Sequence, residues 1–206
     1  MNKEKLKNIF LYYKEKKDRK LYEKIESKEY KIIKILKNDQ RSYVALINIE
    51  GENLIYKQPI EKNSRKWQRF LSIFRGSESR REFQNIEKIN EVGLNGATPH
   101  LAVEKKKGLF VVDSYLIYSY IDGRESSFKD IEIISQELKK IHDLGFLHGD
   151  SHLNNFLIKD NKVYLIDTKL EKNKYGNFGK SFEFMYLEES CPEEIDFDKD
   201  SIYFKG

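Results

Sequence analysis

Residues 144–169 constrain the fold of this chain more than any other stretch. They read LGFLHGDSHLNNFLIKDNKVYLIDTK. Two short runs rich in aromatic and β-branched residues, FLI and VYLI, flank the turn-forming residues Asp160 and Asn161. This pattern predicts a short antiparallel hairpin, because strand-forming runs separated by such residues favour a tight reversal of the chain.

The register of this hairpin predicts which polar residues meet at its end. If Lys159 pairs with Lys162 across a two-residue turn, Asn155 lies opposite Ile166 and next to Asp167. The register of a hairpin is fixed by the length of its turn. We therefore expect the amide of Asn155 and the carboxylate of Asp167 at the same end of the hairpin.

A further carboxylate precedes the hairpin on a short loop. Asp150 lies five residues before Asn155 and follows Gly149, which lets the backbone turn tightly. Two carboxylates and an amide oxygen around one point suit a Mg²⁺ ion that also binds phosphate oxygens. The same arrangement leaves one Asp to accept the proton of an attacking hydroxyl.

Two other interpretations of the same residues were weighed. His148 and His152 have the spacing of a zinc-binding pair, but the residues between them disfavour a helix and the lone cysteine lies far away. Alternatively, Asp150, Asn155 and Asp167 are only turn and capping residues. The coincidence of three spacings favours the phosphoryl-transfer interpretation.

The segments HGDSHLNNFLI and VYLIDT resemble the catalytic loop and metal-binding segment of the protein-kinase-like fold. Their H-G-D-x-H-x-x-N form is similar to that of bacterial small-molecule and sugar kinases. A protein kinase has Arg where this chain has Gly149, and D-F-G where it has residues 167–169. More narrowly, the chain resembles the lipopolysaccharide core heptose kinase family. Residues 65–83, RKWQRFLSIFRGSESRREF, are similar to a pattern of that family. The likeness runs from about residue 31 to 167.

The resemblance implies an α+β, protein-kinase-like fold of two lobes, with a reduced C-terminal lobe. The expected parts are a basic N-terminal segment, an N-terminal lobe and a catalytic lobe, over residues 1–30, 31–118 and 119–206. It also implies ATP-dependent transfer of phosphate to a heptose hydroxyl of the lipopolysaccharide inner core. The implied cofactors are ATP and Mg²⁺, with Asn155 and Asp167 as metal ligands and Asp150 as the catalytic base.

The ATP phosphates would be held by a strand lysine. Position alone leaves open whether Lys57 faces solvent or the phosphates, and the resemblance favours the phosphates and a catalytic role. Glu82 is the expected carboxylate partner, with Glu78 and Glu87 as alternatives. Backbone groups around Tyr120, in the connection between the lobes, would pair with adenine.

The turn that would cover the phosphates holds no glycine. It consists of Asn38, Asp39 and Gln40, so a G-x-G-x-x-G loop is absent. The side chains of Asn38 or Gln40 are conceivable substitutes for backbone amides at this place.

Elsewhere, periodicity predicts the remaining elements. The expected strands are residues 31–36, 42–49, 53–60, 100–103 and 109–120, with a turn over 105–108. The expected helices are residues 128–144 and, near the C-terminus, a short one within 182–190.

Two basic segments could contact an anionic surface. Residues 1–31 suit either an amphipathic helix lying on a membrane or a helix docked on the small lobe. Residues 62–81 mix arginines with aromatic residues and predict a helix on the lobe, whose basic face reaches the anionic substrate or the membrane.

Composition narrows the partners and the compartment. The net charge of +4, from 38 basic and 34 acidic residues, is too mild to indicate a specific nucleic-acid partner. A single cysteine and the lack of a long apolar run favour a cytoplasmic protein, with a peripheral contact to the inner membrane left open.

Three alternatives to the heptose kinase remained open. The acceptor could be a protein or another small-molecule hydroxyl. The chain could instead be a non-catalytic nucleotide-binding or membrane-surface scaffold. A basic RNA-binding module would show steeply salt-dependent affinity and no ATP turnover.

Overall fold

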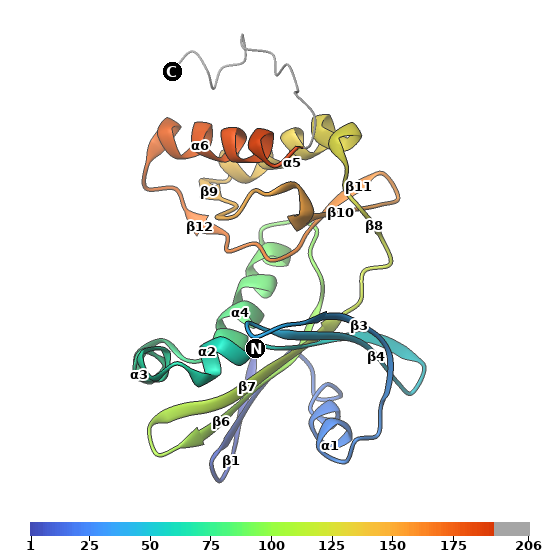
Figure 1. Ribbon diagram of the computed structural model, residues 1–206, viewed down its shortest axis with the longest axis vertical. Helices are drawn as coiled ribbons and strands as arrows, with labels where there is room; N and C mark the ends of the chain where they lie inside the picture. The colour runs from blue at the N-terminus through green and yellow to red at the C-terminus, as the bar shows by residue number, and fades with distance from the viewer. Residues whose placement is uncertain (192–206) are drawn as a thin grey trace. The chain divides into compact units, whose positions relative to one another are not determined.

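The computed structural model describes residues 1–191, and these form two compact units (Figure 1). The first unit consists of residues 1–87 and 98–120, and the second of residues 88–97 together with the chain from residue 121 onward. Among the described residues, no helix is both long enough and apolar enough to cross a membrane.

The first unit is built on a seven-stranded antiparallel sheet. Its strand order is β1-β2-β6-β7-β5-β4-β3. The strands are β1 (Asn2–Leu6), β2 (Ile9–Tyr13), β3 (Lys31–Asn38), β4 (Tyr43–Ile49), β5 (Glu52–Gln58), β6 (Pro99–Lys107) and β7 (Phe110–Ser119).

The predicted meander of three strands is confirmed by β3, β4 and β5, which pair in sequence order. The predicted turn over residues 105–108 is too long. Lys105 and Lys106 belong to β6, and Lys107 pairs with Phe110 at the tip of the β6–β7 hairpin. Lys105 and Lys106 extend this strand while their partly buried side chains pair with Glu26 and Glu104.

The helix proposed for residues 1–31 is wrong for most of that segment. A hairpin, β1–β2, turns at Lys7, which has a positive φ of 53°. Leu11 and Tyr12 are buried in two different apolar clusters, as successive strand residues on opposite faces would be. Only α1 (Lys20–Glu26) is helical here. The strand β2 is therefore buried on both of its faces, a pattern that differs from the one-sided burial of a docked helix.

The helix predicted within residues 62–81 is formed by two helices, and the helix that carries Glu82 follows as a third element. These are α2 (Ile60–Ser64), α3 (Lys66–Arg75) and α4 (Glu78–Glu91). Arg65 is extended between α2 and α3, and Gly76, at φ 76°, ends α3. The strand expected to reach Ile60 ends at Gln58, because Pro59 cannot donate to the sheet.

The second unit packs two helices against short strands. Figure 1 shows α5 (Ile131–Asp143) and α6 (Gly176–Glu189) next to each other, and His142 on α5 bonds Glu183 on α6. The short elements are β8 (Arg124–Glu125), η1 (Phe128–Asp130), β9 (Phe146–Leu147), η2 (Leu153–Asn155), β10 (Phe156–Lys159), β11 (Lys162–Leu165) and β12 (Glu171–Lys172). The predicted helices in both regions are confirmed.

The predicted hairpin is confirmed together with its register. Lys159 pairs with Lys162, and Phe156 pairs with Leu165. Asp160 and Asn161 have φ values of 51° and 57°, as a two-residue turn with both central residues left-handed requires. Buried apolar residues of this hairpin and of α5 form one core, with Phe156, Ile134 and Leu138 fully buried.

Candidate functional site

The predicted contact between Lys57 and Glu82 is present in the first unit. Lys57 lies on β5, where β4 and β7 pair on either side, and Glu82 lies on α4. The ammonium nitrogen of Lys57 is 2.8 Å from Oε1 of Glu82, and the two side chains are only 17% and 20% exposed. A strand and a helix thus hold one cation and one carboxylate together near the surface.

The two alternative partners of Lys57 are engaged elsewhere. Glu78 accepts from Lys62 at 2.6 Å and also bonds Arg81. Glu87 lies 3.3 Å from the N-terminal amino group. Glu82 is therefore the carboxylate that the helix presents to Lys57.

Backbone amides at Tyr120 and in the turn after β3 are already bonded within the protein. The amide of Tyr120 donates to the carbonyl of Asn53 at 3.3 Å, so a contact with adenine would have to use another group of Tyr120. In the turn, Oδ1 of Asp39 accepts from the amides of Arg41 and Ser42, each at 2.8 Å. The bond from Ser42 holds the pKa of Asp39 below its usual value. In this turn, which holds no glycine, the backbone amides bond Asp39 and so stabilise the turn itself.

In the second unit, the loop before the hairpin brings the predicted polar residues together. The amide nitrogen of Asn155 donates to the carbonyl of Asp150 at 2.8 Å. The backbone nitrogen of Ile166 donates to the carbonyl of Asn155 at 3.0 Å. Asn155 is thus tied by its side chain to Asp150 and by its backbone to the residue before Asp167, as the hairpin register predicted.

Two residues of this region adopt left-handed backbone conformations. Asp167 has a φ of 50°, which is uncommon for residues with a side chain but is adopted by Asp more readily than by most. Gly149 has a φ of 83°, and a Cβ added to it would lie 3.0 Å from Cβ of Lys169. Gly149 stands where protein kinases have Arg, and glycine is the residue type that this left-handed backbone conformation favours.

Glu183 on α6 fixes the start of the loop. Its carboxylate accepts from the amides of His148 and Gly149 at 2.9 and 2.6 Å, and lies 2.9 Å from Nε2 of His142. Burial alone would raise the pKa of Glu183, but His142 and the two amides outweigh it and hold the pKa below its usual value. The carboxylate is therefore ionised at neutral pH.

His148 is a buried structural residue. Its Nε2 lies 2.9 Å from the hydroxyl of Thr168, and its carbonyl accepts from the amide of Lys169 at 2.9 Å. Burial lowers the pKa of His148 to about 4, although the charge of Glu183 opposes this shift. The ring is therefore neutral at pH 7 and joins the loop to the segment after Asp167.

The zinc interpretation finds no support in these positions. His152 accepts the amide of Asn154 at its Nδ1, while His148 is fully buried and bonded to Thr168. Within residues 1–191, no group of three or more His, Cys, Asp or Glu could hold a metal ion. One carboxylate and one amide suit Mg²⁺ only if phosphate oxygens complete its shell, as is usual for this ion.

Glu183 and Glu104 are among the buried carboxylates that sequence reasoning missed. Glu183 lies on the face of α6 that buries Phe184 and Leu187, so helical spacing from Leu187 could have placed it inward. Glu104, on β6, accepts from the amide of Ser77 at 2.7 Å and from the hydroxyl of Tyr12 at 3.2 Å. Nothing in the local pattern of lysines around Glu104 signals its burial.

The family model described as lipopolysaccharide core biosynthesis protein (WaaY) matches residues 1–179. The chain belongs to this family. A curated relative, lipopolysaccharide core heptose(II) kinase WaaY of Escherichia coli, is 32% identical over 143 residues, which make up 66% of this chain and 62% of that protein. The chain thus spans less than two thirds of this relative's length.

Solved structures confirm the fold class. This WaaY-family chain matches the structure of WaaP in complex with acyl carrier protein with a TM-score of 0.61 and 13% identity. The match covers 95% of this chain and 86% of the WaaP chain. A double mutant of the PknI kinase domain of Mycobacterium tuberculosis covers 80% of this chain and 74% of its own, with a TM-score of 0.50 and 16% identity. At these identities the likeness concerns the fold alone, which is α+β and protein-kinase-like.

Proposed function

We propose that the protein is an ATP-dependent kinase that phosphorylates a heptose hydroxyl of the lipopolysaccharide core. The observation that carries the proposal is the loop in which Asn155 bonds Asp150 and lies at the hairpin end beside Asp167. Membership of the WaaY family and the heptose kinase relative support the choice of acceptor.

In the proposed mechanism, each residue has a separate task. Asp150 accepts the proton of the attacking heptose hydroxyl. Lys57, oriented by its bond to Glu82, donates to the α- and β-phosphates of ATP. The backbone around Tyr120 contributes to adenine binding. Asn155 and Asp167 would hold Mg²⁺, which neutralises charge on the phosphates when bound.

The metal role can be tested by thermal denaturation. We expect Mg·ATP to raise the melting temperature of the wild type more than metal-free ATP, since Mg²⁺ bridges the protein and the phosphates. The substitution Asp167→Ala should abolish the increment due to Mg²⁺. Lys57→Ala should weaken stabilisation by both forms of ATP. A full Mg²⁺ increment in Asp167→Ala would exclude the proposed metal site.

The acceptor can be tested by transfer of labelled phosphate from ATP. We expect labelling of purified lipopolysaccharide core that carries heptose, and little labelling of core that lacks it. Transfer should also weaken as the salt concentration rises, because the basic segments would attract an anionic acceptor through interactions that salt screens. Labelling of a protein acceptor with heptose-bearing core left untouched would refute the sugar assignment and leave phosphoryl transfer standing.

The same proposal places the enzyme at the cytoplasmic face of the inner membrane as a peripheral protein. The support is the heptose kinase relative, together with basic side chains on β1, β3 and α3. An acceptor anchored in a membrane would be reached best from the membrane surface, which is anionic on its cytoplasmic side.

A further inference from the structure

Helix α3 exposes its aromatic residues. Trp67, Phe70 and Phe74 are 66%, 46% and 79% exposed. Their rings follow one another along the helix, with centroids 5.8 Å apart for Trp67 and Phe70 and 5.9 Å apart for Phe70 and Phe74. We call these three side chains the aromatic ridge. A helix at the surface of a water-soluble protein normally directs such residues toward the core.

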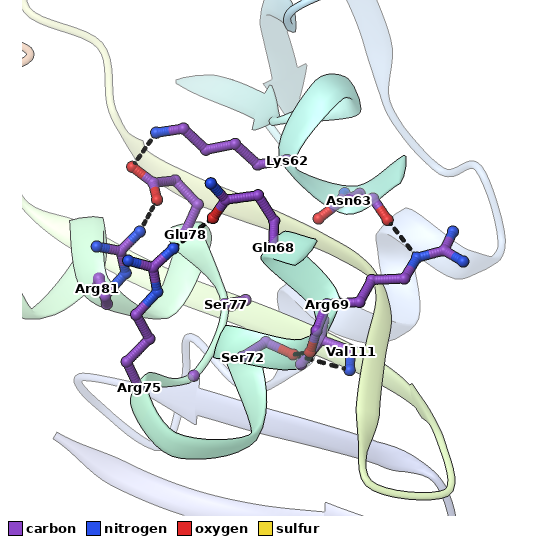
Figure 2. Close-up of a pocket in the computed structure, with 11 residues that line it drawn as sticks. Lys62, Asn63, Gln68, Arg69, Ser72, Arg75, Ser77, Glu78, Arg81 and Val111 are labelled. Carbon is purple, nitrogen blue, oxygen red and sulfur yellow. Dashed lines mark hydrogen bonds and ion pairs between the residues drawn. The ribbon is translucent and has the colours of Figure 1, made fainter. Parts of the chain in front are cut away.

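The polar side of α3 faces the protein instead. Gln68, Arg69, Ser72 and Arg75 of α3 line a small recess together with residues of α2, α4 and β7 (Figure 2). Arg69 donates to the carbonyl of Asn63 at 2.7 Å, and Arg75 bonds Gln68. The hydroxyl of Ser72 accepts from the amide of Val111 at 3.2 Å. The helix is thus anchored by polar contacts, in the reverse of the usual arrangement.

The hairpin tip that bonds α3 also exposes apolar residues. Leu109 and Phe110 precede Val111, whose amide bonds α3, and they are 69% and 42% exposed. Lys107 adjoins them in the sequence. The exposed apolar residues therefore come from two neighbouring elements of the first unit.

The charge around the aromatic ridge selects one kind of partner. Helix α3 carries Lys66, Arg69 and Arg75 and no carboxylate, and Lys66 and Arg75 are exposed near its two ends. Trp and Phe flanked by cations are typical of helices that lie in the interface of an anionic membrane. Exposure of three aromatic rings to water is unfavourable in free energy. A bilayer would bury the rings and attract the cations.

We propose that the aromatic ridge inserts into the interfacial region of an anionic lipid bilayer. This inference deepens the proposed function, on which it rests for a membrane-borne acceptor. The ridge would hold the first unit at the membrane surface while Lys66, which is exposed at the start of α3, contacts lipid phosphates. The partner is the bilayer itself, recognised by its negative charge and its apolar interior.

The proposal can be tested with the intrinsic fluorescence of Trp67, which is the only tryptophan in the chain. Full-length protein is titrated with phosphatidylcholine vesicles, with and without phosphatidylglycerol, in the absence of ATP and acceptor. We expect a blue shift of the emission with the anionic vesicles, and a weaker response at high salt. Failure of catalysis would not affect this measurement, so the two proposals fail separately.

Phe74→Ser is the informative variant, with Phe178→Ser as its control. Phe178, on α6, is 76% exposed and so matches Phe74 in accessibility. Loss of the Phe74 ring should reduce partitioning roughly tenfold, while Phe178→Ser should leave it unchanged. The proposal is overturned if anionic vesicles do not shift the emission, or if both variants weaken binding equally. A shift that depends only on protein concentration would assign the ridge to self-association and would also overturn it.

Discussion

The substitution Asp150→Asn is expected to reduce kcat by roughly 10² to 10⁴, the usual contribution of a general base. The amide cannot accept the proton of the attacking hydroxyl, which corresponds to about 3–5 kcal/mol of activation free energy. Binding of ATP should persist, because the contact between Asn155 and Asp150 uses the backbone carbonyl of Asp150. Labelled-phosphate transfer measures the loss, and stabilisation by Mg·ATP measures the binding.

Asp160→Asn provides a matched control for that variant. It makes the same change of carboxylate to amide in the exposed turn of the hairpin, where φ is 51° and Asn is tolerated. Its kcat should equal that of the wild type. If Asp150→Asn also turns over at the wild-type rate, Asp150 is not the base.

The sequence predicted best where local patterns decide the structure. The β10–β11 hairpin followed from Asp160 and Asn161, because two left-handed turn residues fix the register of their strands. The helix expected at the start of the chain is wrong there, because β2 buries the successive residues Leu11 and Tyr12 on opposite faces and so shows no alternation. The strand β2 owes its position to pairing with the distant β6, which no local pattern reports.

The same distinction applies to the candidate site. The hairpin register predicted Asn155 opposite Ile166 and next to Asp167, and Ile166 does donate to Asn155. Glu82 is the carboxylate that bonds Lys57, as expected. The contact of Glu183 with the loop before the hairpin could not be predicted, because 34 residues separate it from Gly149. Which buried acid meets which backbone amide depends on how α6 packs, and that is a property of the tertiary structure.

Glu183→Ala is expected to lower the free energy of unfolding by about 3–5 kcal/mol. The substitution leaves the amides of His148 and Gly149 and the ring of His142 without their buried acceptor. Such a loss is a large fraction of the stability of an ordinary domain. Denaturant unfolding of the full chain measures it. Glu183→Gln, which keeps one acceptor oxygen, should lose less.

Glu189→Ala controls for the loss of a carboxylate from the same helix. Glu189 is exposed near the end of α6, so its removal should change stability by less than about 0.5 kcal/mol.

The pH dependence of the stability gives a second criterion. Because folding lowers the pKa of Glu183, its stabilisation is present above the ordinary carboxyl pKa and is lost as the pH falls through the folded-state pKa. The difference between wild type and Glu183→Ala should therefore shrink in acid. If Glu183→Ala were as stable as Glu189→Ala at neutral pH, the carboxylate would not be what holds the loop, and the bonds from Ser151 to the Glu183 carbonyl and from Leu153 to Ser190 would suffice.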